Sequence, residues 1–388
     1  MEPLSVGAQR ELRARIGASR YRRRRTKEGP QGAEVVSEGK RVLDFSSNDY
    51  LGLAAHPRLS GAFTQALRQF GVGSGGSPLI GGYTRPIREL ERELAEFTGR
   101  ARALVFSSGY LANLGVIAGL ASRRDTVFMD RLNHASLIDA GLLAGAELKR
   151  YPHRNASALS KALRSSKENR KWVVTESVFS MDGDLAPLPE IAARCRDYEA
   201  MLLVDEAHGI GVYGPGGTGV SAHFGLDCTA VPLLIGTFGK ALGLAGAFVA
   251  GSAELIELLI QKARTLIYCT AMPPALAASV REALTILRTE HWRRERLFEL
   301  VARFREGAQR LGVPLTGVEG PIQPILLGDC AGTAAASAAL MARGIQVAGV
   351  RPPTVPEGTA RLRISISAAH KETHIDRLVD ELALLLCA

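Results

Sequence analysis

Short apolar runs alternate with longer amphipathic stretches over most of the chain from residue 101 onward. Apolar runs of about four to eight residues are typical of buried strands, and hydrophobic positions that recur every three or four residues are typical of helices. A chain that alternates the two forms a parallel sheet with helices on its faces. The pattern therefore predicts an α/β fold with a mainly parallel seven-stranded sheet covered by helices. We expect its strands at Ala103–Phe106, Thr126–Asp130, Glu147–Tyr151, Trp172–Glu176, Met201–Asp205, Leu233–Ile235 and Ala247–Ala250.

The segments that flank this region have different patterns. Ser5–Arg25 is basic and predicts a helix, and short β segments follow it. From about Trp292 onward, the pattern predicts a smaller α+β domain with strands near Pro324–Leu327 and Leu362–Ser367, closed by a helix at His374–Leu386. We therefore expect an N-terminal arm of one basic helix and short strands at 1–49, a large α/β domain at 50–288 and a small C-terminal α+β domain at 289–388.

Composition narrows the class of protein. The chain has 388 residues, of which 46% are hydrophobic and 41 are glycines, and this combination fits an α/β enzyme better than a repeat protein or a disordered chain. The formal net charge is +9, and much of the excess lies in the run Arg20–Lys27. Such a run is most often a solvated basic face, although it can also hold nucleic acid, an anionic membrane or a phosphate-bearing ligand.

The cysteines and the first residues indicate a compartment. Five cysteines are scattered without a C-x-x-C pair, which argues against a disulfide framework or a zinc site and favours a reducing environment. The N-terminus, M-E-P-L-S-V-G, lacks the basic and then apolar regions of a signal peptide. We therefore expect a cytoplasmic protein with no metal site.

The segment Val231–Gly251 is almost wholly apolar but carries one lysine, Lys240, near its middle. Its glycines, its proline and the cost of a central lysine in lipid, about 2.5–3.5 kcal/mol, argue against a membrane span. It reads better as a strand, a glycine-rich turn and a second strand. An apolar site favours the neutral amine, so Lys240 is a candidate nucleophile or Schiff-base former. A lysine whose stem is buried and whose ammonium group reaches water is an equally good interpretation of this segment alone.

Polar residues follow several predicted strands, at the ends where the ligands of α/β sheets collect. Small polar residues after Phe106 open a helix, and the free N–H groups at such a helix start suit a phosphate. A histidine follows the strand that ends at Asp130, and an aspartate ends an apolar strand three residues before another histidine. The whole set consists of Ser108, Gly109, Tyr110, His134, Asp205, His208, Thr237 and Lys240.

One ligand, pyridoxal 5′-phosphate, accounts for this set. Its aldehyde forms a Schiff base with a lysine, which Lys240 would supply, and its pyridinium nitrogen requires a carboxylate, which Asp205 would supply. His208 suits a hydrogen bond to the phenolic oxygen, and His134 suits a ring stacked on the cofactor face. The phosphate would be held by Ser108, Gly109, Tyr110 and Thr237.

Other classes of protein fit less well. The tetrapeptide from Asp205 to His208 spells D-E-A-H, a helicase signature, but the chain has no G-x-x-x-x-G-K-[ST] loop for nucleotide phosphates. The G-x-G-x-x-G at Gly71–Gly76 follows a predicted helix rather than a strand, which excludes a dinucleotide site. There is no G-x-S-x-G elbow of a serine hydrolase. The non-enzyme alternative is a basic nucleic-acid-binding protein, which would show a strongly salt-dependent affinity for DNA.

Longer motifs surround these residues. They are V-D-E-A-H-G-I-G-V-Y-G and T-F-G-K-A-L-G, together with F-S-S-N-D-Y-L-G-L, S-S-G-Y-L-A-N, D-R-L-N-H-A-S-L and T-E-S-V-F-S-M-D-G-D. They resemble the motifs of the α-oxoamine synthases, fold-type I pyridoxal-phosphate enzymes that condense an amino acid with an acyl thioester. The resemblance runs from about Arg20 to the C-terminus and so covers nearly the whole chain.

The resemblance implies roles for the matched residues. The catalytic residues would be Lys240, His134, Asp205 and His208. Glu176 and Ser180 would also line the cofactor site, and Thr270 would reach the cofactor of a second subunit. Substrate would be bound by Arg22, Asn48, His134, Thr354 and Arg363, with the bidentate guanidinium of Arg363 on the carboxylate of the amino acid.

The resemblance also implies substrates and partners. The runs at Gly73–Tyr83 and Arg351–His370 look most like those of family members that join L-alanine to a pimeloyl thioester, pimeloyl-CoA or pimeloyl-ACP, in biotin biosynthesis. In such members Lys240 would remove the α-proton of alanine. A homodimer with shared active sites is implied, with neither nucleic acid nor a membrane as a partner. Members that use glycine and acetyl-CoA remain the alternative, since substrate choice depends on pocket volume.

Overall fold

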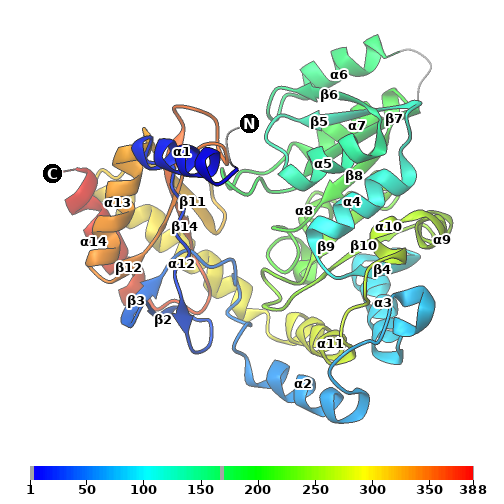
Figure 1. The fold of residues 1–388 in the computed structure, drawn as a ribbon, viewed down its shortest axis with the longest axis horizontal. Coiled ribbons are helices and arrows are strands. Elements are labelled where there is room, and N and C mark those ends of the chain that lie inside the picture. Colours follow the sequence, from blue (N-terminus) through cyan, green and yellow to red (C-terminus); the bar gives the residue numbers. More distant parts are fainter. Residues whose placement is uncertain (1–3, 167–169, 388) are drawn as a thin grey trace. The chain divides into compact units, whose positions relative to one another are not determined.

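The computed structural model describes residues 4–166 and 170–387 and divides into two compact units (Figure 1). The large unit consists of Leu53–Ser180 and Asp184–Arg294. The small unit consists of the chain up to Gly52, the short piece Met181–Gly183 and the chain from Glu295 onward. The arm that the sequence predicts at 1–49 therefore belongs to one unit with the C-terminal residues.

The large unit is built on a seven-stranded sheet with the strand order β4-β10-β9-β8-β7-β5-β6. The pairs from β9 to β6 are parallel, whereas β10 runs antiparallel to both β4 and β9. This sheet confirms the predicted α/β fold, with a strand at each of the seven expected places. The strands are β4 (Arg102–Phe106), β5 (Asp125–Asp130), β6 (Glu147–Tyr151), β7 (Arg170–Glu176), β8 (Met201–Asp205), β9 (Leu233–Thr237) and β10 (Ala247–Gly251).

Helices cover this sheet (Figure 1). One of them, α4 (Gly109–Leu120), is buried along most of its length. Its sequence is apolar on all sides, and helices of that kind lie in protein interiors. Val116 of α4 belongs to one core cluster with Val127 of β5 and Leu203 of β8. The helices are α2 (Pro57–Phe70), the π-helical turn η1 (Pro78–Gly82), α3 (Arg85–Thr98), α4 (Gly109–Leu120), α5 (Ala135–Ala144), α6 (Ala156–Ser165), α7 (Leu188–Asp197), the 3₁₀ turn η2 (Pro215–Gly217), α8 (Val220–His223), α9 (Ala253–Lys262), α10 (Arg264–Ile267) and α11 (Pro274–Thr289).

The small unit contains two small sheets, as its predicted α+β class requires. In the first, of order β1-β2-β3-β12, β3 pairs in parallel with β12 from near the other end of the chain. The second, of order β11-β14-β13, is antiparallel. The elements are α1 (Leu4–Gly17), β1 (Lys27–Glu28), β2 (Glu34–Ser37), β3 (Lys40–Asp44), α12 (Trp292–Arg310), β11 (Ile322–Gly328), α13 (Cys330–Ala342), β12 (Ile345–Gln346), β13 (Ala348–Val350), β14 (Ala360–Ser365) and α14 (Glu372–Leu386).

The N-terminal helix α1 is shorter than the sequence predicts, because it ends at Gly17 rather than at Arg25. The arginines beyond it contact partners far along the chain. Arg20 pairs with Glu357 at 2.6 Å, and Arg22 donates a hydrogen bond to Thr354 at 2.7 Å. The predicted end was wrong because these tertiary contacts, which no local pattern reveals, outweigh local helix propensity.

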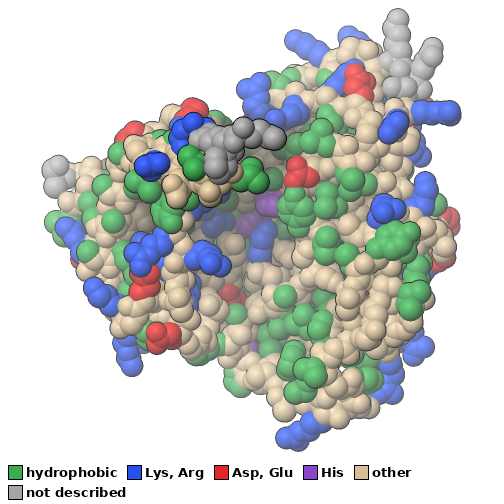
Figure 2. Space-filling model, viewed as in Figure 1, with side chains coloured by type: hydrophobic (Ala, Val, Ile, Leu, Met, Phe, Trp, Pro, Cys, Tyr) green, Lys and Arg blue, Asp and Glu red, His purple; other side chains and the backbone are tan. Residues whose placement is uncertain are grey.

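On the face drawn in Figure 2, Lys and Arg side chains form separate small groups with acidic and apolar side chains between them. This face therefore lacks the continuous basic track that follows a nucleic-acid backbone. Among the helices of residues 4–166 and 170–387, none has both the length and the hydropathy needed to cross a membrane.

Gly243, in the turn between β9 and β10, has a left-handed backbone with φ of +70°. A Cβ atom there would lie 2.3 Å from the Ala54 nitrogen and 2.6 Å from the Leu53 carbonyl carbon. We expect Gly243→Ala to lower the free energy of unfolding by about 1–3 kcal/mol in denaturant titrations, because it adds backbone strain and crowding. Gly239→Ala is the matched control in the same turn, since its Cβ would meet nothing closer than 3.5 Å. Equal stability of the two variants would contradict this account.

Candidate active site

Parallel strands of the large unit end at one edge of the sheet, and residues of the predicted site stand at or just beyond these ends. Glu176 ends β7, Asp205 ends β8 and Thr237 ends β9. His134 follows β5 and begins α5 as its N-cap residue. Lys240 lies three residues beyond Thr237 and is half-buried. Because the carboxyl ends of parallel strands share one edge, the sheet gathers these residues from four separate segments.

Asp205 is buried, with 5% of its surface exposed, and both of its carboxylate oxygens accept hydrogen bonds. Oδ2 accepts from the side-chain amide of Asn113 at 2.8 Å, and Oδ1 accepts from the Ala207 N–H at 2.9 Å. Both donors are neutral. A carboxylate that is held in this way keeps a fixed orientation and can still pair with a cationic ring nitrogen.

Asn113 also connects Asp205 to His134. Its amide nitrogen donates a second hydrogen bond to the Ser136 hydroxyl at 2.9 Å, which lies 2.7 Å from Nδ1 of His134. The Ser136 N–H also donates to this Nδ1, at 3.3 Å, so the neutral ring carries its proton on Nε2. Burial lowers the pKa of His134; the Asp205 carboxylate opposes this shift and the Lys240 ammonium adds to it. Burial therefore favours the neutral imidazole form of His134, which suits a ring stacked on a cofactor.

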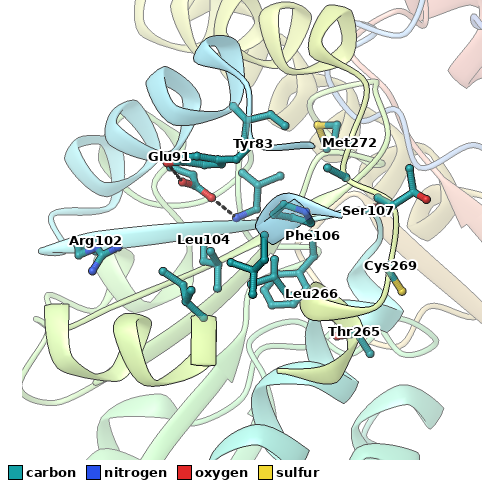
Figure 3. Close-up of a pocket in the computed structure, with 17 residues that line it drawn as sticks. Tyr83, Glu91, Arg102, Leu104, Phe106, Ser107, Thr265, Leu266, Cys269 and Met272 are labelled. Atoms are coloured by element: carbon teal, nitrogen blue, oxygen red, sulfur yellow. Dashed lines mark hydrogen bonds between the residues drawn. The ribbon is translucent and has the colours of Figure 1, made fainter. Parts of the chain in front are cut away.

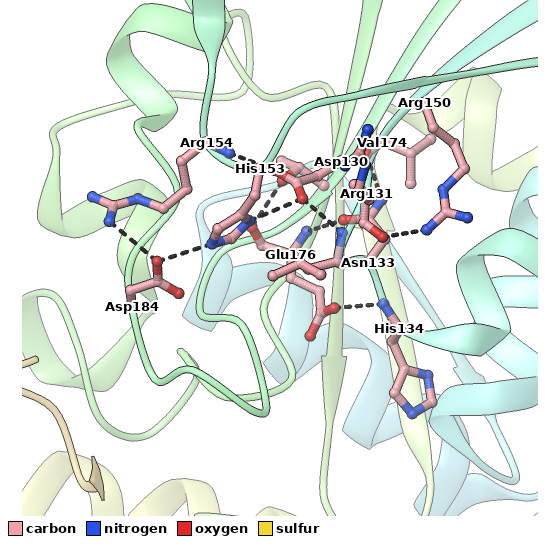
Figure 4. A network of polar contacts seen from close by, with 12 residues as sticks. Asp130, Arg131, Asn133, His134, Arg150, His153, Arg154, Val174, Glu176 and Asp184 are labelled. Carbon is pink, nitrogen blue, oxygen red and sulfur yellow. Dashed lines mark hydrogen bonds and ion pairs between the residues drawn. The ribbon is translucent and has the colours of Figure 1, made fainter. Parts of the chain in front are cut away.

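Glu176 is buried and joins two loops of the site (Figure 4). Its Oε1 accepts the His134 N–H at 2.6 Å, and the carboxyl group also receives a backbone hydrogen bond from Ser180. Burial raises the pKa of Glu176, and the charge of Asp205 raises it further, while Lys240 lowers it. Because Lys240 affects both Glu176 and His134, its amine belongs to the same electrostatic cluster as Asp205.

A second group of predicted residues stands at the start of α4. Ser108 is the N-cap and accepts the Leu111 N–H at 3.2 Å, so the first turn of the helix presents its N–H groups at Gly109. A Cβ atom on Gly109 would lie 3.9 Å from Oγ1 of Thr237, and the Gly239 N–H donates to that oxygen at 3.2 Å. Hydroxyl groups beside a helix N-terminus form a phosphate site.

The remaining predicted residues of the large unit lie around these two groups. His208 is buried in the turn after β8, and Tyr110 is partly exposed and donates a hydrogen bond from its hydroxyl to Asp139. Thr270 has an exposed side chain, and its carbonyl oxygen accepts the Ser107 hydroxyl at 3.1 Å.

The predicted substrate residues other than His134 belong to the small unit. The guanidinium of Arg363 is buried and donates to the Ser365 hydroxyl at 2.8 Å and to the Asn48 side-chain oxygen at 3.1 Å. Arg22 and Thr354, which are hydrogen-bonded to each other, line a cavity of about 700 Å³ together with Arg363. The structure thus brings Arg363 next to Asn48 and Arg22 next to Thr354 within this unit.

The residues of the large unit fit pyridoxal 5′-phosphate. A buried carboxylate, a neutral imidazole, an amine and a helix N-terminus are the four kinds of group that the cofactor's ring nitrogen, ring face, aldehyde and phosphate require. The buried Oδ1 of Asn113 has no hydrogen-bond partner within the described part of the chain. Among the same residues, no cluster of three or more His, Cys, Asp or Glu side chains is arranged to hold a metal ion.

A smaller cavity of about 170 Å³ in the large unit lies apart from this chemistry (Figure 3). Its lining is mostly apolar and, of the predicted site, includes only Thr270. Glu91 accepts hydrogen bonds from the Tyr83 hydroxyl at 2.7 Å and from the Val105 N–H at 3.0 Å, and burial raises its pKa to about 7. Glu91, the buried carboxyl group of this wall, thus has hydrogen-bond donors within the lining of the cavity.

Sequence reasoning missed the linking residues Asn113 and Ser136. Asn113 lies four residues after Gly109 and is a buried polar residue in an otherwise apolar helix, which is a usable signal. Ser136 offers no comparable signal, because a serine in the first turn of a helix is common.

The chain matches the family described as aminotransferase class I and II over residues 40–382. It is 54% identical over 376 residues to an 8-amino-7-oxononanoate synthase of Nitrosococcus oceani, covering 97% of this chain and 100% of that protein. A protein of the same name from Methylococcus capsulatus is 55% identical over 373 residues, or 96% of each chain.

Solved structures show the same likeness. Serine palmitoyltransferase from S. paucimobilis, with a bound PLP–myriocin aldimine, has a TM-score of 0.94 at 33% identity and covers 99% of this chain and 98% of its own. An 8-amino-7-oxononanoate synthase from Francisella tularensis has a TM-score of 0.78 at 30% identity and covers 88% of this chain and 97% of its own.

Proposed function

The chain belongs to the aminotransferase class I and II family and, within it, to the pyridoxal-phosphate-dependent 8-amino-7-oxononanoate synthases of biotin biosynthesis, and we propose that it joins L-alanine to a pimeloyl thioester. The products would be 8-amino-7-oxononanoate, CO₂ and the free thiol of the carrier. The observation that carries this proposal is the 54% identity to an enzyme of that name over its entire length.

Four residues of the large unit would hold the cofactor ring. Asp205 would pair with the ring nitrogen, His208 with the phenolic oxygen and His134 with the ring face, and Lys240 would be the covalent attachment point. Ser180 and Glu176 would border the ring. The chemistry that bound pyridoxal phosphate supplies is an electron sink for negative charge at the α-carbon of the amino acid.

Lys240 would move the proton of the reaction. Its Nζ would take the proton from the α-carbon of alanine and return a proton there after carboxyl loss. Asp205 would support this step because its charge would keep the ring nitrogen protonated, and the Asn113 hydrogen bond at 2.8 Å holds its carboxylate in place. Neutral His134 adds no competing positive charge.

The small unit would supply the groups for the substrate carboxylates and the acyl chain. We propose that Arg363 binds the alanine carboxylate, because a guanidinium can donate two parallel hydrogen bonds to a carboxylate and the hydrogen bonds to Ser365 and Asn48 hold this guanidinium in a fixed orientation. Arg22 and Thr354, on the wall of the 700 Å³ cavity, would contact the acyl substrate. A homodimer with shared sites is part of the proposal, with Thr270 of one copy serving the cofactor of the other.

A substrate panel tests the proposal. Purified protein loaded with pyridoxal phosphate is given alanine, glycine or serine, each with pimeloyl-CoA, acetyl-CoA or palmitoyl-CoA, and thiol release and product mass are measured. We expect kcat/KM for alanine with pimeloyl-CoA to exceed that of every other pair by at least about 10-fold, because specificity arises from differential transition-state binding. A parallel assay with pimeloyl-ACP compares the two carriers. Faster turnover of glycine with acetyl-CoA would make the substrate assignment wrong.

A further inference from the structure

His153, which stands two residues beyond β6, bridges two carboxylates (Figure 4). Its Nδ1 lies 2.9 Å from Oδ1 of Asp130, and its Nε2 lies 3.0 Å from Oδ2 of Asp184. Ionised carboxylates only accept hydrogen bonds, so both ring nitrogens must donate, and the ring is an imidazolium. The sequence gives His153 no role in the site.

The surroundings of His153 favour this charged form. Burial alone lowers the pKa of the imidazole, but the hydrogen bonds to Asp130 and Asp184 outweigh it and raise the pKa to about 9. The ring also packs edge-on against Phe179, with 4.4 Å between the ring centroids. Arg154 also contacts this group: its guanidinium donates to Asp184 at 3.1 Å, and its backbone N–H donates to Asp130 at 2.8 Å. Tyr151 is a further titratable neighbour of Asp130, and burial together with the charge of Asp130 raises the pKa of its hydroxyl.

Asp130 and Asp184 each also accept a backbone hydrogen bond within a segment that carries a residue of the candidate active site. Asp130 also accepts the Leu132 N–H at 2.8 Å, which shapes the turn leading to His134. The Asp184 carbonyl accepts the Phe179 N–H at 3.0 Å, next to Ser180, in a hairpin closed by the bridge between residues 178 and 185.

The same two segments are joined a second time by Glu176. Its carboxyl group receives backbone hydrogen bonds from His134 and from Ser180. The loop after β5 and the hairpin after β7 are thus connected by Glu176 on one side and by the His153 bridge on the other.

We propose that His153 is a positioning residue, which fixes His134 relative to Ser180 by bridging Asp130 and Asp184. This inference rests on the proposed function, because it assigns His134 to the cofactor ring. His153 itself touches neither the ring nor the substrate in this proposal. The folded-state pKa lies above the ordinary value of about 6.5, so the bridge is complete at neutral pH and is lost as the pH rises through about 9.

The test compares His153→Gln with His223→Gln, an exposed histidine of the same unit. We expect His153→Gln to lower kcat by about 10- to 100-fold with KM for alanine changed by less than about threefold, because displacement of His134 impairs the reacting geometry more than binding. The visible circular dichroism of bound pyridoxal phosphate, which reports ring orientation, should change in this variant and stay unchanged in the control. Above pH 9, the wild-type signal should approach that of the variant.

Two measurements, the NMR titration of His153 and the dichroism of the bound cofactor, need no turnover and therefore separate this inference from the proposed function. The imidazole of His153 should titrate near pH 9 in NMR spectra of the wild-type holoprotein. If His153→Gln does not fold, Asp184→Asn replaces it, and we expect a lower His153 pKa together with the altered dichroism. Titration of His153 near its ordinary pKa, or a kcat loss with unchanged dichroism, would overturn the positioning role. If the wild type turned over none of the substrates while the NMR titration of His153 and the dichroism of the cofactor were as expected, the substrate assignment would be wrong and the positioning role would stand.

Discussion

Lys240→Ala is expected to lower kcat by at least about 10³-fold while the protein stays folded, because it removes both the covalent attachment point and the group that moves the α-proton. The side chain is half-buried in the turn between β9 and β10. Removing it takes away no core packing, so the unfolding midpoint should change little.

Two quantities are measured for this variant, the pyridoxyl adduct after reduction and the turnover. Reduction with borohydride followed by peptide mass analysis should find a pyridoxyl group on the peptide that contains Lys240 in the wild type and none in the variant. Lys262→Ala, at the exposed end of α9, is the control and should keep both the adduct and turnover. Residual activity of Lys240→Ala near the control level would rule out the assigned chemistry.

Asp205→Asn is expected to lower kcat by at least about 100-fold without releasing the cofactor from Lys240. The amide keeps the shape of the carboxylate but not its charge, so the ring nitrogen would lose its partner. The amide also has one oxygen where the carboxylate has two, so either Asn113 or Ala207 would face a donor in place of an acceptor.

A pH readout accompanies this variant. The negative charge of Asp205 raises the pKa of Glu176 and of His134, so its removal should lower both. The NMR resonances of the His134 ring report the change in its pKa directly. Asp197→Asn, at the partly exposed end of α7, serves as the control. An Asp205→Asn enzyme with kcat within about threefold of the control would contradict the role of Asp205.

The seven-stranded sheet could be predicted because most of its strands are short apolar runs separated by helical stretches, a pattern that depends on local sequence alone. The sequence pattern predicts the glycine-rich turn around Lys240 but did not assign a direction to β10. That turn is too short for the crossover that a parallel neighbour needs, so β10 runs antiparallel to β9. The end of α1 was misplaced for a different reason: Arg20 pairs with Glu357, 337 residues away, and local propensity carries no trace of that contact.

The candidate active site also contains some residues that the sequence could identify and others that it could not. Asp205 and Lys240 were assigned from the sequence because their residue types at strand ends match the needs of one cofactor. Asn113, His153 and Ser136 were not, because their importance lies in which side chains they connect. Contacts such as the one from His153 to Asp184, across 31 residues, exist only in the folded chain.

The pairing of β3 with β12 has a consequence for how the chain matures. Gln346 of β12 donates to Asp44 of β3 across a separation of 302 residues, so the first sheet of the small unit needs two segments that are far apart in the sequence. On a ribosome, nearly all of the large unit emerges before Gln346 is synthesised, and domains generally fold as they emerge. The N-terminal strands must therefore wait for their partner until residue 346 has been synthesised, and a product truncated before Ile345 would leave that sheet edge exposed.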